Sequence, residues 1–247
     1  AIKQEQESQL LQENLAALGT MISGIAHELN NPLTGMGLTL QNLAANLGEL
    51  KTAEVQKRLQ IVRKDLDRAS RIVSDILGFA SPGKMRFARS SLHQVIQKAY
   101  QNTNRLYPLL CRQVNWELEN EDILIDMDVE KMERLFINLF RNTIQALDYR
   151  EGTIKVTFHD SNRYVHIIVE DNAGGIAADL SKKIFQPFFT KGQNRGGTGL
   201  GLSICHSIVK EHYGNIHVRS FEKKTRFYIS IPLRHQMPNQ APGDTIQ

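Results

Sequence analysis

Residues 18–33 have the sequence LGTMISGIAHELNNPL, in which apolar residues recur at steps of four, three, four and four. Steps that alternate between three and four place apolar side chains along one stripe of an α-helix, as in a coiled-coil seam. The same spacing extends in both directions, so the pattern predicts one long amphipathic helix. The members of this first seam are Leu11, Leu15, Leu18, Ile22, Ile25, Leu29, Leu33, Met36, Leu40, Leu43 and Leu47.

Two irregularities fall on one turn of this predicted helix. The consecutive four-residue steps from Ile25 to Leu33 create an eleven-residue repeat, which relaxes a left-handed supercoil. Pro32 lies in the same turn, where it removes a backbone donor and is expected to bend the helix. We therefore expect a hinge at this turn.

A second apolar seam follows a polar break at residues 48–52. Its members are Val55, Leu59, Val62, Leu66, Ala69, Val73, Ile76 and Ala80. Two seams joined by a short turn predict an antiparallel helical hairpin. Apolar residues beside the seams, Ile61, Ile72 and Leu77, favour two hairpins that dimerise into a four-helix bundle over a monomeric coiled coil.

His27 lies outside the first seam. At about 100° per residue it lies about 140° from Ile22, and Asn31, four residues on, shares its face of the helix. Glu28 is its neighbour in the chain. A lone helical histidine is most often an ordinary surface residue, but an imidazole whose Nδ1 is held by a carboxylate presents Nε2 as a nucleophile. Such a nucleophile needs an electrophile, which a second domain would have to supply.

The sequence changes character after the Ser-Pro-Gly at residues 81–83, which predicts a helix end and a linker. Ser91 with Gln94 predicts a capped helix to about residue 103, and Asp128 can cap a helix that runs to residue 147. A third helix is expected at residues 200–212. Strands are expected at residues 113–118, 123–127, 153–158, 164–170, 215–220 and 226–231. Mixed strands with helices on one face predict an α+β two-layer sandwich.

The bulk composition excludes several classes of protein. The 247 residues are 41% hydrophobic and 23% charged, with a net charge of +4 and no basic run, so we expect no nucleic-acid binding. Cys111 and Cys205 lie far apart, which predicts reduced cytoplasmic thiols rather than a disulfide framework or a zinc site. No run approaches the roughly 18–20 apolar residues that span a bilayer, so we expect no direct membrane contact of this chain. A chain that begins at Ala1 in a helical pattern suggests part of a longer protein, which could itself be anchored in a membrane.

Two stretches of the second domain contain polar groups suited to a nucleotide. In NLFRN (residues 138–142), Asn138 and Asn142 lie four apart on one helix face, and carboxamide oxygens are ligands that Mg²⁺ accepts beside phosphates and water. In VEDNAGGI (residues 169–176), Asp171 ends a strand and can accept a hydrogen bond from an adenine amine, while the glycines let the ring approach. Taken singly, each stretch is also compatible with an ordinary helix surface or turn.

Two further stretches flank a glycine-rich segment. IFQPFFTKG (residues 184–192) has three phenylalanines before polar residues, as at the hinge of a mobile lid or in a hydrophobic plug under a loop. GGTGLGLS (residues 196–203) leads into an apolar helix, whose N-terminal amides and dipole favour phosphate. It is neither a Walker A nor a Rossmann sequence, because no GK[ST] follows and no βαβ unit surrounds it. The four stretches in this order predict an ATP site.

On these motifs the chain resembles the cytoplasmic core of the sensor histidine kinases of two-component systems, over nearly all of residues 10–233. AHELNNPL (residues 26–33) is similar to the phosphoacceptor box of that family and NLFRN to its N box. DNAGG, FQPFFT and GTGLGL are similar to its first glycine box, its phenylalanine box and its second glycine box. The resemblance implies a dimeric helical hairpin for histidine phosphotransfer, followed by a Bergerat-type ATP-binding domain.

The resemblance also implies roles for residues of the hairpin. His27 would be the phosphoacceptor and Glu28 its general base. Asn31 would position the water that dephosphorylates the response regulator.

In the second domain, the resemblance implies that Asn142 is a Mg²⁺ ligand with Asn138 beside the nucleotide, and that Asp171 binds adenine. The other expected nucleotide contacts are Gly175, Gly197, Thr198, Gly199, Leu200 and Gly201. Lys191 and Arg195, in the lid, are expected to contact phosphate because of their charge.

The resemblance divides the chain into five segments. We expect an N-terminal linker or signal helix at residues 1–19 and the dimerisation and phosphotransfer hairpin at residues 20–81. A linker at residues 82–90 precedes the catalytic domain at residues 91–233, and residues 234–247 are expected to form a flexible tail.

Three features depart from the family pattern. Ala173 stands where the first glycine box usually has glycine, which could narrow the adenine pocket. Gln145 stands where many members have lysine, a charge that Arg141 or a lid residue would have to replace. The lid is short, at about ten residues, as in relatives that resemble nitrogen-regulation and dicarboxylate sensors.

The predicted function is therefore an ATP- and Mg²⁺-dependent protein-histidine kinase, a cytoplasmic homodimer. It would autophosphorylate His27, pass the phosphoryl group to an aspartate on the receiver domain of a response regulator, and also act as the phosphatase of that regulator. A hydrolytic ATPase such as DNA gyrase is one alternative, but it would need a glutamate at the position of Asn138. A degenerate scaffold that binds nucleotide without transfer is another, supported only by Ala173 and Gln145.

Overall fold

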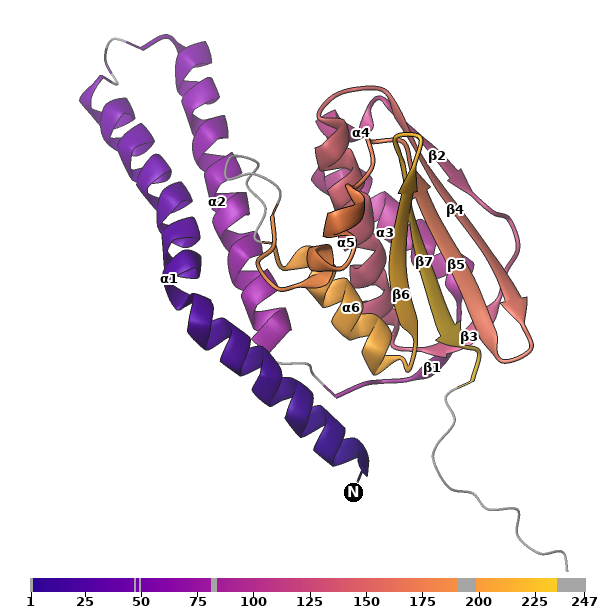
Figure 1. Cartoon of the computed structure of the whole chain (residues 1–247). Coiled ribbons are helices and arrows are strands. Elements are labelled where there is room, and N and C mark those ends of the chain that lie inside the picture. The colour runs from indigo at the N-terminus through magenta and orange to yellow at the C-terminus, as the bar shows by residue number, and fades with distance from the viewer. Residues whose placement is uncertain (1, 47, 49, 81–83, 191–198, 235–247) are drawn as a thin grey trace, which may run out of the picture. The chain divides into compact units, whose positions relative to one another are not determined.

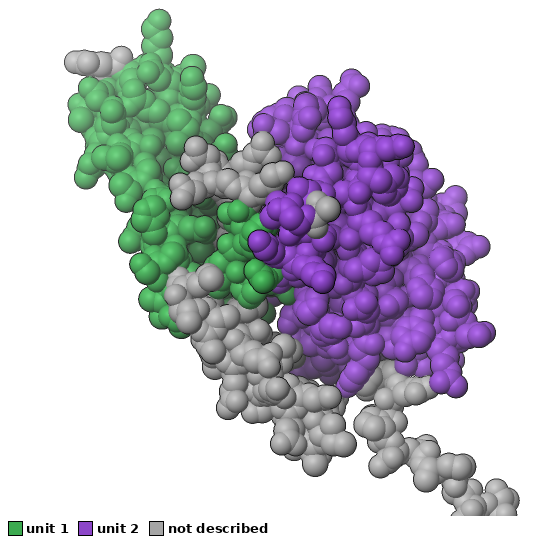
Figure 2. All heavy atoms as spheres, viewed as in Figure 1, with its two compact units in different colours: residues 1–83, 186–204 green, residues 84–185, 205–247 purple. Residues whose placement is uncertain are grey.

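A computed structural model of the 247-residue chain describes residues 2–46, 48, 50–80, 84–190 and 199–234. The chain divides into two compact units (Figure 2), residues 1–83 with 186–204 and residues 84–185 with 205–247. The predicted order, a helical hairpin followed by an α+β sandwich, is confirmed (Figure 1). The predicted tail beyond residue 234 lies outside the described residues.

The hairpin consists of α1 (Ile2–Ala45) and α2 (Thr52–Ala80), which pack against each other (Figure 1). α1 continues through Pro32, and its axis changes direction part-way along its length. A proline inside a helix removes one hydrogen bond and its ring clashes with a carbonyl of the preceding turn, so Pro32 is a sufficient cause of a bend.

Each apolar seam is split between two environments. On both helices, one heptad series faces into the hairpin and is buried or half-buried, whereas the other series is exposed to between 42% and 53%. The inward series is Leu29, Met36 and Leu43 on α1, with Val55, Val62, Ala69 and Ile76 on α2. The exposed series is Leu33 and Leu40 on α1, with Leu59, Leu66 and Val73 on α2. One hairpin therefore buries only half of the apolar surface that its seams provide.

The second unit is built on a five-stranded mixed sheet in the order β2-β4-β5-β7-β6, in which β2 runs parallel to β4 and the other neighbours are antiparallel. Its strands are β2 (Val114–Leu118), β4 (Gly152–Ser161), β5 (Tyr164–Asp171), β6 (Asn215–Phe221) and β7 (Lys224–Pro232). Its helices are α3 (Leu92–Leu106), α4 (Pro108–Cys111) and α5 (Val129–Leu147), with short 3-10 turns η1 (Ala178–Leu180) and η2 (Lys183–Phe185). The helix α6 (Gly201–Glu211) begins in the segment 186–204 of the first unit and continues into the second. Residues along β4, β5 and β7 alternate between buried and accessible, so one face of the sheet packs on helices and the other is open.

The predicted caps fix where two of the helices begin. Ser91 Oγ accepts a hydrogen bond from the backbone N–H of Gln94 at 3.1 Å, which starts α3. The Asp128 carboxylate accepts from the N–H of Lys131 at 3.2 Å, which starts α5, and also from the N–H of Arg86 at 2.8 Å. A capping side chain satisfies a backbone donor that the helix itself leaves unpaired.

Two short elements were not predicted. β1 (Ala88–Ser91) pairs antiparallel with β3 (Leu124–Met127) as a separate two-stranded sheet, and α4 begins at Pro108. The sequence of β1 is ARSS, which has neither alternation nor β-branched residues, so only its long-range partner makes it a strand. Cys111 and Cys205 are both buried and free. Within the described ranges, no helix is long and apolar enough to cross a membrane.

Candidate functional site

His27 is exposed on α1, on the face that the helical periodicity predicts. Its Nδ1 lies 3.4 Å from Nδ2 of Asn31, one turn further along the helix. The expectation that Glu28 would hold Nδ1 is not met, because no hydrogen bond joins Glu28 to the imidazole in the described part of the hairpin. The Asn31 carboxamide lies there instead, and if it is turned so that its oxygen accepts from Nδ1–H, Nε2 is left as the unprotonated, open ring nitrogen.

Glu28 is half-buried between its own helix and α2. Burial raises the pKa of its carboxyl above the ordinary value of 4.5, while the positive charges of Arg68 and His27 act in the opposite direction. In its ionised form, which the two positive charges favour, this carboxylate can accept a proton from the imidazole. Glu28 therefore has the electrostatic setting of a general base, without the hydrogen bond to the imidazole that the sequence suggested.

The two asparagines of α5 have polar ends that the protein does not satisfy. Asn138 is buried, Asn142 is half-buried, and Nδ2 of each is enclosed without a hydrogen-bond partner among the described residues. Rotating a carboxamide by half a turn exchanges its oxygen and nitrogen, so the unpaired position can equally hold a metal-binding oxygen. Buried polar atoms without a partner are rare in folded proteins, and they fit a site that pairs them with a ligand.

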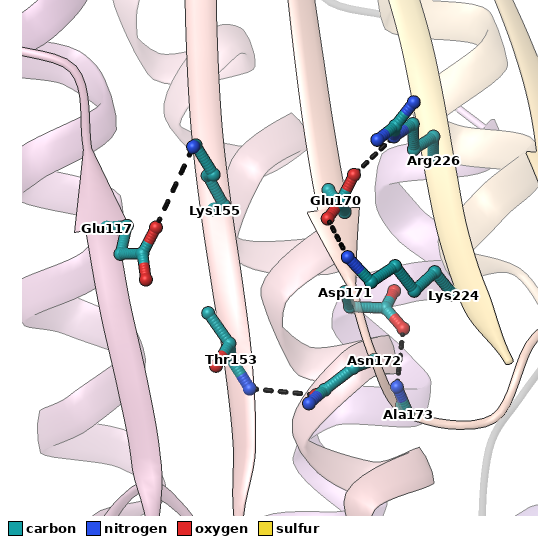
Figure 3. Close-up of polar contacts among 9 residues, drawn as sticks. All are labelled: Glu117, Thr153, Lys155, Glu170, Asp171, Asn172, Ala173, Lys224 and Arg226. Carbon is teal, nitrogen blue, oxygen red and sulfur yellow. Dashed lines mark hydrogen bonds and ion pairs between the residues drawn. The ribbon is translucent and has the colours of Figure 1, made fainter. Parts of the chain in front are cut away.

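Asp171, the last residue of β5, links the sheet to α5. Its Oδ1 accepts from the backbone N–H of Ala173 at 2.9 Å (Figure 3), and its Oδ2 accepts from Thr143 Oγ1 at 3.1 Å. Burial raises the pKa of the Asp171 carboxyl above its ordinary 3.8, against the lowering effect of hydrogen bonds from Ala173, Thr143 and Thr225. An acid that is buried at a strand end despite this penalty marks a functional position.

The neighbours of Asp171 on the strand point elsewhere. Glu170 lies on the open face of the sheet, where it forms ion pairs with Lys224 and Arg226 of β7 (Figure 3). Asn172 turns back to β4, and its Oδ1 accepts from the N–H of Thr153 at 2.8 Å. Asp171 is thus the one acid of this segment that faces α5.

The loop after Asp171 explains the departure at Ala173. Gly174 and Gly175 have φ of 122° and 79°, which side chains disfavour, whereas Ala173 does not have positive φ. The loop is held against the β6–β7 turn, since Gly174 N–H donates to the Lys223 carbonyl at 3.1 Å and Ile176 N–H donates to Ser220 Oγ at 2.9 Å. A methyl group at residue 173 therefore costs no backbone strain.

α6 begins at Gly201, immediately after Gly199 and Leu200. Gly199 has a φ of 65°, and a Cβ there would lie 2.4 Å from the backbone carbon of Phe188. Leu200 is fully buried, and its carbonyl accepts from the N–H of Ile204. The expected phosphate contacts Lys191, Arg195, Gly197 and Thr198 lie outside the described residues.

Two threonines that the sequence analysis missed support the carboxylate. Thr143 and Thr225 are both buried, and both donate hydrogen bonds to Asp171. Thr143 directly follows Asn142, so a polar residue at the edge of the NLFRN motif was a usable signal. Thr225 is 54 residues from Asp171 in the sequence, and only the β5–β7 register makes them partners.

We predict that Asp171→Asn stabilises the protein at neutral pH. Because folding raises the pKa of Asp171, its charged form opposes folding, and this penalty grows as pH rises from about 3.8 through the raised pKa. The variant should gain about 0.5–2 kcal/mol in free energy of unfolding at pH 7 and converge with the wild type below about pH 4. Denaturant unfolding at both pH values measures this, with the exposed Asp160→Asn as control. A less stable variant at pH 7, or a difference that does not change with pH, would contradict the assignment.

Comparison with known families matches both parts of the chain. Residues 17–84 match the His Kinase A (phospho-acceptor) domain, and residues 127–235 match the histidine kinase-, DNA gyrase B- and HSP90-like ATPase domain. His27 and Asn31 lie in the first match, and Asn142 and Asp171 lie in the second.

Individual proteins agree with these matches. The sensor histidine kinase ZraS of Escherichia coli O157:H7 is 34% identical over 92% of this chain and 49% of its own length, so the chain spans about half of such relatives. The structure of histidine kinase ThkA in complex with response regulator protein TrrA has a TM-score of 0.75 and 30% identity, over 93% of this chain and 66% of that one. The catalytic domain of ThkA alone is 33% identical, with a TM-score of 0.54, over 61% of this chain and 100% of its own. The chain belongs to the sensor histidine kinases.

Proposed function

We propose that this chain is an ATP-dependent protein-histidine kinase, which phosphorylates His27 and passes the phosphoryl group to an aspartate of a response regulator. The observation that carries the proposal is the state of His27. Its imidazole is exposed, and Nδ1 lies 3.4 Å from the Asn31 carboxamide. With the carboxamide turned so that its oxygen accepts from Nδ1–H, Nε2 carries the lone pair and is open. A helical histidine with one occupied and one open nitrogen is a nucleophile ready for an electrophile brought by the second unit.

In the proposed transfer, Nε2 of His27 attacks the γ-phosphorus of ATP in line with the bridging oxygen. The bond from that oxygen to the γ-phosphorus breaks and ADP leaves. The imidazole carries a positive charge once the N–P bond forms, and a base must take its proton. Glu28, half-buried beside the imidazole, is the proposed base.

The second unit would bind and orient the nucleotide. Asp171 would accept a hydrogen bond from the adenine amine, and Gly175 would let the ring approach the backbone. Asn142 would be the metal ligand with Asn138 beside it, and bound Mg²⁺ would neutralise the phosphate charges. The phosphates would meet the start of α6 and the lid, through Gly197, Thr198, Gly199, Leu200, Gly201, Lys191 and Arg195.

The kinase is proposed to act as a homodimer. The exposed heptad series of α1 and α2 lies at the positions that a second hairpin would cover in a four-helix bundle. Large apolar side chains that repeat every seven residues on both helices fit such a partner better than water does.

The partner of the dimer is proposed to be a receiver domain, and the place of action to be the cytoplasm. The related ThkA was solved in complex with a response regulator protein. We also propose the reverse activity, in which Asn31 positions water against the phosphoaspartate of the regulator.

A labelling experiment separates the kinase from an ATPase and from a nucleotide-binding scaffold. With γ-labelled ATP and Mg²⁺, the wild type should take up acid-labile, base-stable label, and His27→Gln should take up none. The control is His159→Gln, which removes another exposed histidine and should label normally. Phosphate release without label would favour the ATPase, and neither signal would favour the scaffold. Label of the same stability on His27→Gln would exclude His27 as acceptor.

We predict that Asn31→Ala separates the two activities. Its 3.4 Å contact with Nδ1 is long for a hydrogen bond, so autophosphorylation should stay within about threefold of the wild type. Loss of the water-positioning amide should slow dephosphorylation of the regulator by about tenfold or more. Phosphate loss from a pre-phosphorylated receiver domain measures this, with the exposed neighbour Asn30→Ala as control. Equal dephosphorylation rates for wild type and Asn31→Ala would remove the proposed role.

A further inference from the structure

Arg68 on α2 has a polar atom that the fold leaves unpaired. Its Nε is enclosed and has no hydrogen-bond partner among the described residues. The other two such atoms are Nδ2 of Asn138 and Nδ2 of Asn142, both at the proposed nucleotide site. An enclosed N–H without an acceptor costs about 1–3 kcal/mol, so a fold that retains one calls for an explanation.

The packing of the hairpin places Arg68 at the level of the phosphoacceptor turn. Asp65 of α2 faces Gly35 of α1 closely, since a Cβ on Gly35 would lie 2.9 Å from Asp65 Oδ2. The helices run in opposite directions, so the next turn of α2, at Arg68, faces the preceding turn of α1, at Asn31 and Pro32. Glu28 lies one turn further along α1 from these residues, and the charge of Arg68 acts on its carboxyl.

Glu28 lies between two cationic groups. Arg68 acts on it from the facing helix and His27 from its own, and Arg68 has the larger effect of the two. One turn before Arg68 on α2 is an acid, Asp65. It lies opposite Gly35, about two helical turns along α1 from Glu28. The described hairpin thus puts a carboxylate, an imidazole and a guanidinium together at one turn.

We propose that Arg68 is a positioning residue for phosphoryl transfer to His27, which holds Glu28 as a carboxylate beside the imidazole. Burial alone would favour the protonated form of Glu28, which cannot accept a proton from the imidazole. Arg68 supplies the counter-charge that keeps the base ionised. This inference rests on the proposed kinase function and names a residue of the opposite helix on which its proton transfer depends.

The same cation acts after transfer. A phosphoryl group on Nε2 of His27 brings about two negative charges close to Glu28, and like charges at this range repel. The guanidinium balances them, and its unpaired Nε–H has an acceptor in either the carboxylate or a phosphoryl oxygen.

The test is the pH dependence of autophosphorylation in the full chain, with Mg²⁺-ATP and labelled phosphate. Arg68→Gln should lower the rate at pH 7 by at least about threefold, because removing the cation favours the protonated form of Glu28. Removing a group that lowers the pKa of Glu28 must raise that pKa, so the acid limb of the pH–rate profile should move to higher pH. The KM for ATP should stay unchanged, and Arg68→Lys should restore the acid limb by restoring the charge.

The control is Arg63→Gln, which removes an exposed arginine of the same helix and should leave both rate and profile unchanged. An unshifted acid limb in Arg68→Gln, or an equal loss in Arg63→Gln, would overturn the proposal. If Arg68→Gln does not fold, the pH–rate profile of Arg68→Lys tests the proposal instead. Lysine keeps the charge, so a profile that differs from that of the wild type would contradict a role based on charge. His27→Gln in the same assay tests the kinase function itself, because label on that variant would contradict the proposed function. If label depends on His27 but the Arg68→Gln profile is unshifted, only the role of Arg68 is contradicted.

Discussion

The catalytic unit depends on one buried carboxylate. Asp171 ends β5, and hydrogen bonds from Thr143 and Ala173 tie it at once to α5 and to the loop that follows the strand. The same contact fixes where α5 lies against the sheet, and so where Asn138 and Asn142 present their unpaired carboxamides. Burial of this carboxylate lowers the stability of the fold. Such a loss of stability is common where a residue serves ligand binding.

A different constraint shapes the hairpin, which has more apolar seam than two helices can bury. One heptad series packs within the hairpin and the other stays exposed, which supports the proposal that a second apolar partner covers it. Pro32 interrupts the hydrogen bonding of α1 one turn after His27. The turn that holds His27 and Glu28 therefore precedes a break in the backbone hydrogen bonding of α1.

Local patterns predicted most of the fold because its elements are locally specified. Ser91 and Asp128 predicted the starts of two helices because their side chains can cap a helix N-terminus. The heptad steps around Ile25 predicted the first helix of the hairpin. β1 could not be predicted, because its strand character comes wholly from pairing with β3. Even the nearest register pair, Ser91 and Leu124, lies 33 residues apart in the sequence, and no local pattern spans that distance.

The residues of the candidate sites also fall into two groups, those that the sequence predicts and those that only the fold reveals. His27, Asn142 and Asp171 stand in short motifs whose residue types reveal their chemistry, so the sequence was enough to name them. Thr225 and Arg68 reach the sites only through strand register and helix packing, which a single sequence does not encode locally. The measurement that tests the central claim most directly is the position of the phosphate on the His27 ring, by ¹⁵N–³¹P NMR of the phosphorylated chain. Because the Asn31 carboxamide lies against Nδ1 and Nε2 is the open nitrogen, the account predicts phosphate on Nε2, and phosphate on Nδ1 would contradict it.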